Sequence, residues 1–169
     1  MIQKWIGAGL VFAGCTGAGF LKASAYRREE RLLADTYRLL EQMENELSFR
    51  VSDVYILCDL SRNFSKELAS FYDAVKENLL NQSADTVSDA MEIVCREGNS
   101  LPQSVYEMQF LLGQTLGQYD LEGQLREISS VKEICRQKLT ALQDNREDKL
   151  KSYQTLGLCA GAALALMLL

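Results

Sequence analysis

The sequence predicts an all-α protein, a compact bundle of about six helices flanked by an N-terminal and a C-terminal transmembrane helix. Three observations predict it. Apolar residues recur at helical spacing through the middle of the chain, Pro102 is the one proline in 169 residues, and each end carries a long run without charge. We therefore divide the chain into an anchor at residues 1–22, a helical domain at 23–151 and an anchor at 152–169.

The two terminal runs are just long enough to cross a bilayer. Trp5–Leu21 has 17 residues and Ser152–Leu169 has 18, so each spans roughly 26 Å as a helix, against a hydrocarbon core of about 30 Å. Gly157 and Gly161 in the second run are four residues apart, a small-residue spacing that lets another membrane helix approach closely.

Alternatives stay open for both runs. The first run is either a retained anchor, a signal peptide cleaved after Ala23-Ser24-Ala25, or a lipoprotein signal ending at Cys15. The alternative for the C-terminal run is a core helix of a soluble bundle.

Basic residues flank both runs on the side of the central domain. They are Lys22, Arg27, Arg28 and Arg31 after the first run, and Arg146, Lys149 and Lys151 before the second. The positive-inside rule then places the central domain in the cytoplasm, held by two antiparallel spans.

The first three helices of the central domain follow from their apolar stripes. The stripes cover residues 33–47, 54–58 and 68–79. We expect Ser65 to cap the third helix.

The fourth helix is expected to start near Asp85 and to end at Gly98, a residue suited to the position after a helix. Ser100 and Gln103 have the spacing of a capping box, with Pro102 in the first turn of the fifth helix, whose stripe covers 105–112.

Asp120 is expected to cap the sixth helix, whose stripe covers 121–142. Nothing in the sequence stops this helix before Ser152, so we expect it to continue into the C-terminal run as one rod. The N-terminal run and the helix at 33–47 are expected to be joined in the same way.

A corner between the last two helices of the domain is the candidate site. Gly113 and Gly117 lie on one helix face, and each costs about 1 kcal/mol relative to alanine inside a helix. Two such costs indicate close helix–helix contact. We expect these glycines, with Asp120 and Gln124, to form a structural corner or a surface that docks a partner, and the two readings are compatible.

Charge and cysteine usage exclude some function classes. The middle of the chain has 16 basic and 23 acidic side chains, a net charge of −7, so nucleic-acid binding is not expected. The five cysteines form no C-x-x-C pair, which fits a reducing compartment better than a disulfide framework.

The sequence predicts no enzyme. It has no histidine, no G-x-S-x-G and no P-loop, and the pair Glu44 and Glu46 lacks the E-x-x-H partner of a di-metal site. We predict no catalytic, cofactor-binding or metal-binding residues.

Three segments carry a resemblance to a known family. "LGQTLGQYDLEGQ", "KSYQTLGLCAGAALALMLL" and "LLEQMENEL", together with the N-terminal run, resemble stage III sporulation protein AB of endospore-forming bacteria. This family is similar to the cytoplasmic helical domain of the type II secretion F protein, an inner-membrane platform.

The resemblance implies a platform component of a secretion-like channel, anchored at both ends in the mother-cell membrane around the forespore. It implies as partners a secretion-type ATPase and other stage III sporulation membrane proteins, besides the lipid bilayer. The alternative is a membrane-tethered helical sensor or regulator, which neighbouring genes would distinguish. The oligomeric state stays open, and a homo-oligomer is compatible with the sequence.

Overall fold

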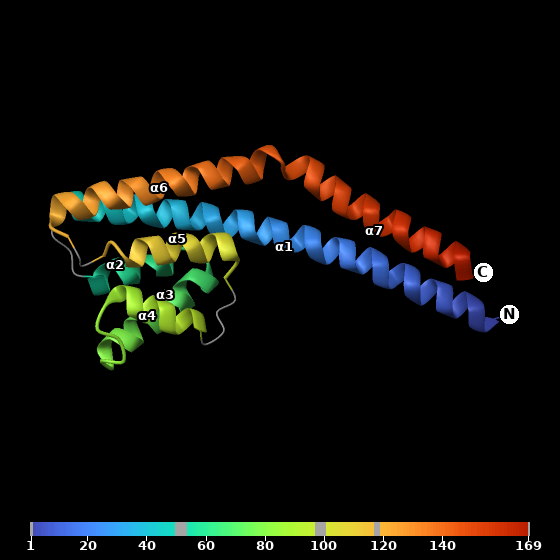
Figure 1. Ribbon diagram of the computed structural model, residues 1–169, viewed down its shortest axis with the longest axis horizontal. Helices are drawn as coiled ribbons and strands as arrows, with labels where there is room; N and C mark the ends of the chain where they lie inside the picture. Colours follow the sequence, from blue (N-terminus) through green and yellow to red (C-terminus); the bar gives the residue numbers. More distant parts are fainter. Residues whose placement is uncertain (1, 50–53, 97–100, 117–118, 169) are drawn as a thin grey trace. The chain divides into compact units, whose positions relative to one another are not determined.

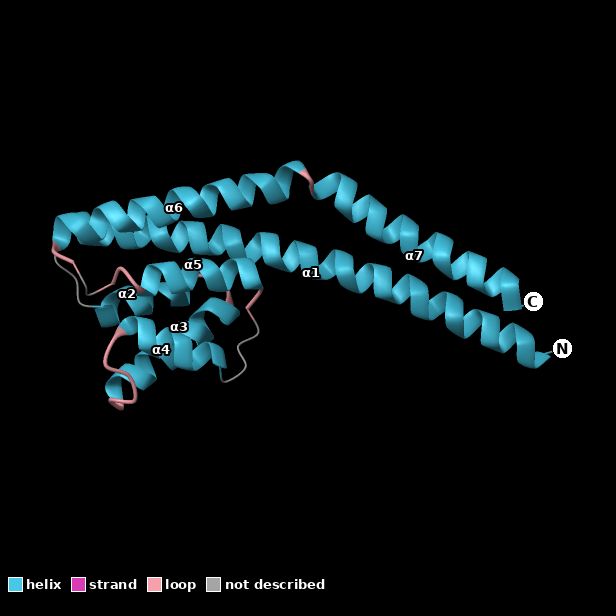
Figure 2. Ribbon diagram, viewed as in Figure 1, coloured by secondary structure: helices cyan, strands magenta, loops and turns pink. Residues whose placement is uncertain are grey.

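The computed structural model describes residues 2–49, 54–96, 101–116 and 119–168, with only the backbone described for residues 2–12, 15, 16, 147, 150, 153, 154, 157, 161 and 164–168. Within these ranges the chain is helical and contains no strand (Figures 1 and 2). The helices are α1 (Ile2–Phe49), α2 (Val54–Leu60), α3 (Lys66–Leu80), α4 (Val87–Arg96), α5 (Gln103–Gly113), α6 (Leu121–Asp144) and α7 (Arg146–Leu168), with a 3₁₀ turn at Ser61–Asn63. The all-α prediction is confirmed.

The chain divides into two compact units. One contains residues 1–30 and 141–169, and the other contains residues 31–140. In the first unit, the N-terminal part of α1 and α7 run antiparallel beside each other (Figure 1). The second unit holds α2 to α5, together with the remainder of α1 and most of α6.

The N-terminal run and the first apolar stripe form one continuous helix, α1, as expected. Its buried face in the second unit is made by leucines and a methionine at helical spacing. The fully buried members are Leu32, Leu33, Leu39, Leu40, Met43 and Leu47.

The start of α3 differs from its prediction. Ser65 stands at the N-cap position, but its side chain makes no capping hydrogen bond, and its buried hydroxyl has no partner in the structure. Ion pairs connect the preceding segment to α3 instead, from Lys76 to Asp59 at 2.7 Å and from Arg62 to Asp73 at 2.8 Å. Ser65 is therefore a boundary residue without a side-chain cap.

α4 begins near its expected start at Asp85, and α5 begins differently from its prediction. Thr86 caps α4, because its Oγ1 accepts the backbone N–H of Asp89 at 3.1 Å. At α5, Pro102 occupies the N-cap position instead of the first turn, and its carbonyl accepts the N–H of Tyr106 at 2.9 Å. Gly98 and Ser100 lie outside the described residues.

The single rod expected from α6 into the C-terminal run is wrong. α6 ends at Asp144 and α7 begins at Arg146, with Asn145 between them. The Asn145 side chain donates to the backbone carbonyl of Ala141 at 2.8 Å. The backbone carbonyl of Asn145 accepts the N–H of Lys149 at 3.0 Å. An asparagine favours such a helix break, since its side chain competes with the backbone for hydrogen bonds.

A buried polar chain connects three helices of the second unit. The Tyr72 hydroxyl on α3 donates to Gln109 Oε1 on α5, and Gln109 Nε2 donates to Thr36 Oγ1 on α1 at 3.2 Å. Thr36 then donates to the carbonyl of Leu32 at 2.8 Å. These side chains are at most 1% exposed, so the completed network stabilises one arrangement of α1, α3 and α5.

In the part of the chain that the structure describes, no helix is long and apolar enough to cross a membrane. Most side chains of the expected spans in residues 1–22 and 152–169 lie outside the described residues.

Candidate functional site

Gly113 lies where α5 packs tightly against α4. A Cβ atom at this position would stand 2.7 Å from Met91 Sδ and 3.4 Å from Ser88 Cα. The helix that Gly113 meets is α4, whereas the sequence suggested the helix that follows Asp120. Gly117 lies outside the described residues.

Asp120 caps α6. Its Oδ1 accepts the backbone N–H of Gly123 at 3.1 Å, and its carbonyl accepts the N–H of Gln124 at 2.9 Å. This is the geometry of an N-cap residue bonded to the third amide of the helix. Gln124, which is half-buried, therefore belongs to the first turn of α6 rather than to the α4–α5 contact.

Sequence reasoning missed Gly123. A Cβ there would lie 2.8 Å from Asp120 Oδ1 and 2.9 Å from Tyr119 Cβ, so the absence of a side chain leaves room for the capping carboxylate. The sequence could have indicated this contact, because Gly123 stands three residues after Asp120, the expected cap.

Charged pairs connect α6 to its neighbours in the second unit. Lys138 pairs with Glu107 of α5, and Lys132 pairs with Glu44 of α1. The Lys138 ammonium, with help from Gln103, lowers the pKa of Glu107, and Glu44 raises the pKa of Lys132. The pairing of Glu44 with Lys132 gives Glu44 a structural role between α1 and α6.

Four consecutive exposed residues precede and open α6: Tyr119, Asp120, Leu121 and Glu122. We call them the corner surface. Tyr119 is 55% exposed and Leu121 is 37% exposed. The corner surface therefore offers an exposed tyrosine and leucine that alternate along the chain with two carboxylates, at a helix start that the Asp120 cap holds in place.

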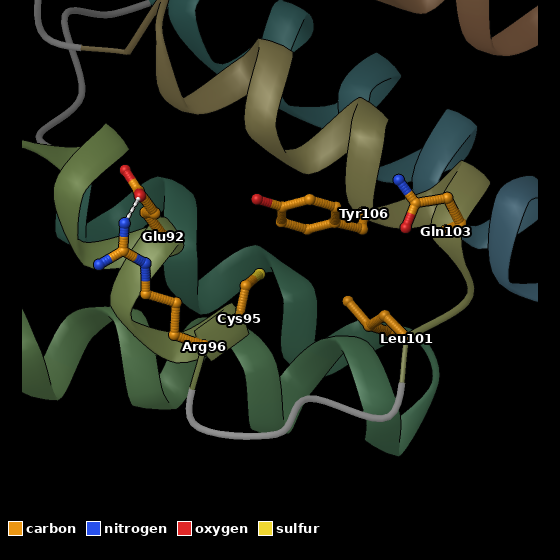
Figure 3. A pocket seen from close by; sticks show the side chains of 6 residues that line it. All are labelled: Glu92, Cys95, Arg96, Leu101, Gln103 and Tyr106. Atoms are coloured by element: carbon orange, nitrogen blue, oxygen red, sulfur yellow. Dashed lines mark hydrogen bonds and ion pairs between the residues drawn. The ribbon is translucent and has the colours of Figure 1, made fainter.

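A pocket of 310 Å³ lies between α4 and α5. Figure 3 shows its lining, with an ion pair between Arg96 and Glu92. The lining residues are Glu92, Cys95, Arg96, Leu101, Gln103 and Tyr106. Partial burial is the main cause that raises the pKa of Tyr106, and the neighbouring Cys95 raises it further. Across the described residues, no group of three His, Cys, Asp or Glu side chains is arranged to hold a metal ion.

The basic residues that flank the terminal runs have different surroundings. Arg146 pairs with Glu30 at 3.3 Å, and the Lys149 ammonium lies 5.5 Å from the centre of the Tyr26 ring. Arg31, in the second unit, pairs with Glu67 at 3.7 Å. The other flanking residues are Lys22, Arg27 and Lys151, which are exposed, and Arg28, which is half-buried.

The expected small-residue packing in the C-terminal run is not tested, because Gly157 and Gly161 lie outside the residues whose surroundings the structure describes. In the N-terminal run, a Cβ at Gly14 or Gly17 would meet nothing within 4 Å. These two positions face open space in the structure.

A family model and a solved structure that match this chain carry the same family name. The family model for stage III sporulation protein AB matches residues 4–169. A solved structure of a stage III sporulation protein AB is similar with a TM-score of 0.53 and 19% identity, covering 75% of this chain and 97% of that chain. At this identity the structural match shows a shared fold. No curated protein matches the sequence.

Proposed function

We propose that this chain, which belongs to the stage III sporulation protein AB family as the resemblance predicted, is a structural platform in a secretion-like sporulation complex and docks a secretion-type ATPase. The observation that carries the proposal is the family match over residues 4–169, which includes the corner and both terminal runs.

We propose that both ends of the chain anchor it in the mother-cell membrane around the forespore, with the central helices in the cytoplasm. The antiparallel pairing of α1 and α7 in one unit supports this, because both uncharged runs then lie together. Exposed Lys22, Arg27 and Lys151 at the inner ends of the runs suit a headgroup region with phosphate groups.

The corner surface is the proposed docking site for the ATPase. Tyr119 and Leu121 supply exposed apolar area of the kind that anchors protein interfaces, and Asp120 and Glu122 supply charge around it. The Asp120 cap fixes the start of α6 at this surface, so a partner would not need to order it on binding.

Co-purification from sporulating cells tests the docking. The tagged chain should retain the ATPase, and Leu121→Asp should lose it, because a carboxylate replaces the apolar side chain at the first position of α6. Aspartate is well tolerated there next to the positive end of the helix dipole. Leu80→Asp, at the C-terminal end of α3 where the leucine is 62% exposed, is the control for an added carboxylate elsewhere on the surface. Equal retention by Leu121→Asp would exclude the corner surface.

A topology reporter tests the anchoring. Inserted at Ser83, in the exposed turn after α3, it should report a cytoplasmic location. An exterior-dependent reporter that is active at Ser83 would contradict the double anchor.

A further inference from the structure

The break between α6 and α7 has its own set of hydrogen bonds. In an uninterrupted helix, the carbonyls of Ala141 and Leu142 would accept the backbone N–H groups four residues later. Here Asn145 Nδ2 donates to the Ala141 carbonyl at 2.8 Å, and the Tyr26 hydroxyl donates to the Leu142 carbonyl at 2.6 Å. Of these two bonds, the one from Tyr26 comes from another helix, whereas an asparagine that donates to the carbonyl four residues earlier also occurs inside the continuous helix α3, at Asn78.

Contacts from α1 also hold the first turn of α7. The Lys149 ammonium lies over the ring of the same Tyr26 at 5.5 Å, within the range of a cation–π interaction. Glu30, one turn after Tyr26 on α1, pairs with Arg146 at 3.3 Å. Tyr26 is only 7% exposed, so water has little access to it. Its hydroxyl contacts α6 before the break, and its ring contacts α7 after the break.

We infer that the break at Asn145 is a two-state joint and that Tyr26 holds it in the broken state. In the straight state, the Leu142 carbonyl exchanges the Tyr26 hydroxyl for the backbone N–H four residues later, so it keeps one donor. The contacts of Arg146 and Lys149 with α1 belong to the broken state, and a partner that binds one state better shifts the balance between the two. Tyr26 and Asn145 are positioning residues, and the inference does not depend on the proposed membrane or ATPase roles.

Amide hydrogen exchange of the full chain in mild detergent tests the joint. In the broken state, the first backbone N–H groups of α7, at residues 146–148, have no acceptor four residues earlier in their own helix. They should exchange quickly in the wild type. Tyr26→Phe removes only the hydroxyl donor and Asn145→Leu removes the side-chain donor, so each should slow exchange severalfold, and the double variant by about tenfold or more.

Tyr119→Phe is the matched control, since Tyr119 is exposed and remote in sequence from the joint, and it should leave the exchange of residues 146–148 unchanged. Asn145 is exposed, so Asn145→Leu gives a reading even where Tyr26→Phe disturbs packing. Exchange in the double variant as fast as in the wild type, with helix content preserved, would overturn the joint. Slowing by Asn145→Leu but not by Tyr26→Phe would overturn the role of Tyr26.

Discussion

At the scale of single residues, Gly113 permits the α4–α5 contact. Because a Cβ there would lie 2.7 Å from the sulfur of Met91, which is fully buried, alanine requires Met91 to move. We expect Gly113→Ala to lower the free energy of unfolding by about 1–3 kcal/mol, the usual cost of overpacking. Urea unfolding of the variant and the wild type measures it.

A double-mutant cycle with Met91→Ala provides the control. Truncation of Met91 alone should cost about 2–5 kcal/mol, but Gly113→Ala should then cost less than it does beside an intact methionine. A gain of up to about 1 kcal/mol from Gly113→Ala, as for an open helix position, would show that the contact is not tight.

Buried titratable side chains make the stability sensitive to alkali. Burial raises the pKa of the Cys135 thiol from 9.0 to about 12 and raises the pKa of Tyr72 well above 10.0. Both groups stay neutral in the folded chain while they ionise in the unfolded chain. Their contribution to the free energy of unfolding is therefore complete below about pH 9. It is lost as the pH rises toward 12, at up to about 1.4 kcal/mol per pH unit for each group.

The comparison of Cys135→Ala with the wild type isolates the thiol. The variant is expected to be less stable at neutral pH, because it loses buried atoms, but its unfolding free energy should fall less between pH 9 and pH 10. Parallel pH curves for the two proteins would show that Cys135 does not contribute to the alkaline loss.

At the scale of helices, the sequence predicted well the elements that a repeating apolar face creates. The stripe from Leu33 to Leu47 and the stripe of α3 are buried where the period places them, apart from Tyr37 and Leu79, which are half-buried. The sequence could not show that Gln109 is buried, since its burial depends on two partners, Tyr72 and Thr36, that are 37 and 73 residues away along the chain.

The break at Asn145 was missed for a related reason. No proline or glycine marks it, and one of the donors that stabilise it is Tyr26, 116 residues before Leu142. The sequence proposed a corner from Gly113 and Gly117, but it did not predict the helix that Gly113 contacts, because periodicity gives a face and not the identity of the neighbour.

The cap of α6 makes a prediction at this scale. Asp120→Ala removes the carboxylate that accepts the Gly123 N–H, so it should cost about 1 kcal/mol of stability. Ser65→Ala is the matched control, since the Ser65 hydroxyl makes no capping bond, and its loss should cost little or nothing. Thermal unfolding measures both variants. A similar loss from both would contradict a specific role for the Asp120 carboxylate.

At the scale of the whole molecule, the two proposed activities, membrane attachment and ATPase docking, belong to different units. The unit made of residues 1–30 and 141–169 holds both uncharged runs, and the unit made of residues 31–140 holds the corner surface. A platform requires both activities in one chain, attachment to a membrane and recruitment of the ATPase to it.

Flotation of the ATPase with vesicles tests both activities together. The full chain is reconstituted into vesicles that contain anionic phospholipid, the secretion-type ATPase is added, and the mixture is centrifuged through a density gradient. We expect the ATPase to float with vesicles that carry the wild-type chain or Leu80→Asp, and about tenfold less with Leu121→Asp. An ATPase that stays at the bottom with the wild-type chain, while the chain itself floats, would contradict the docking role, and a chain that does not float would contradict the anchoring.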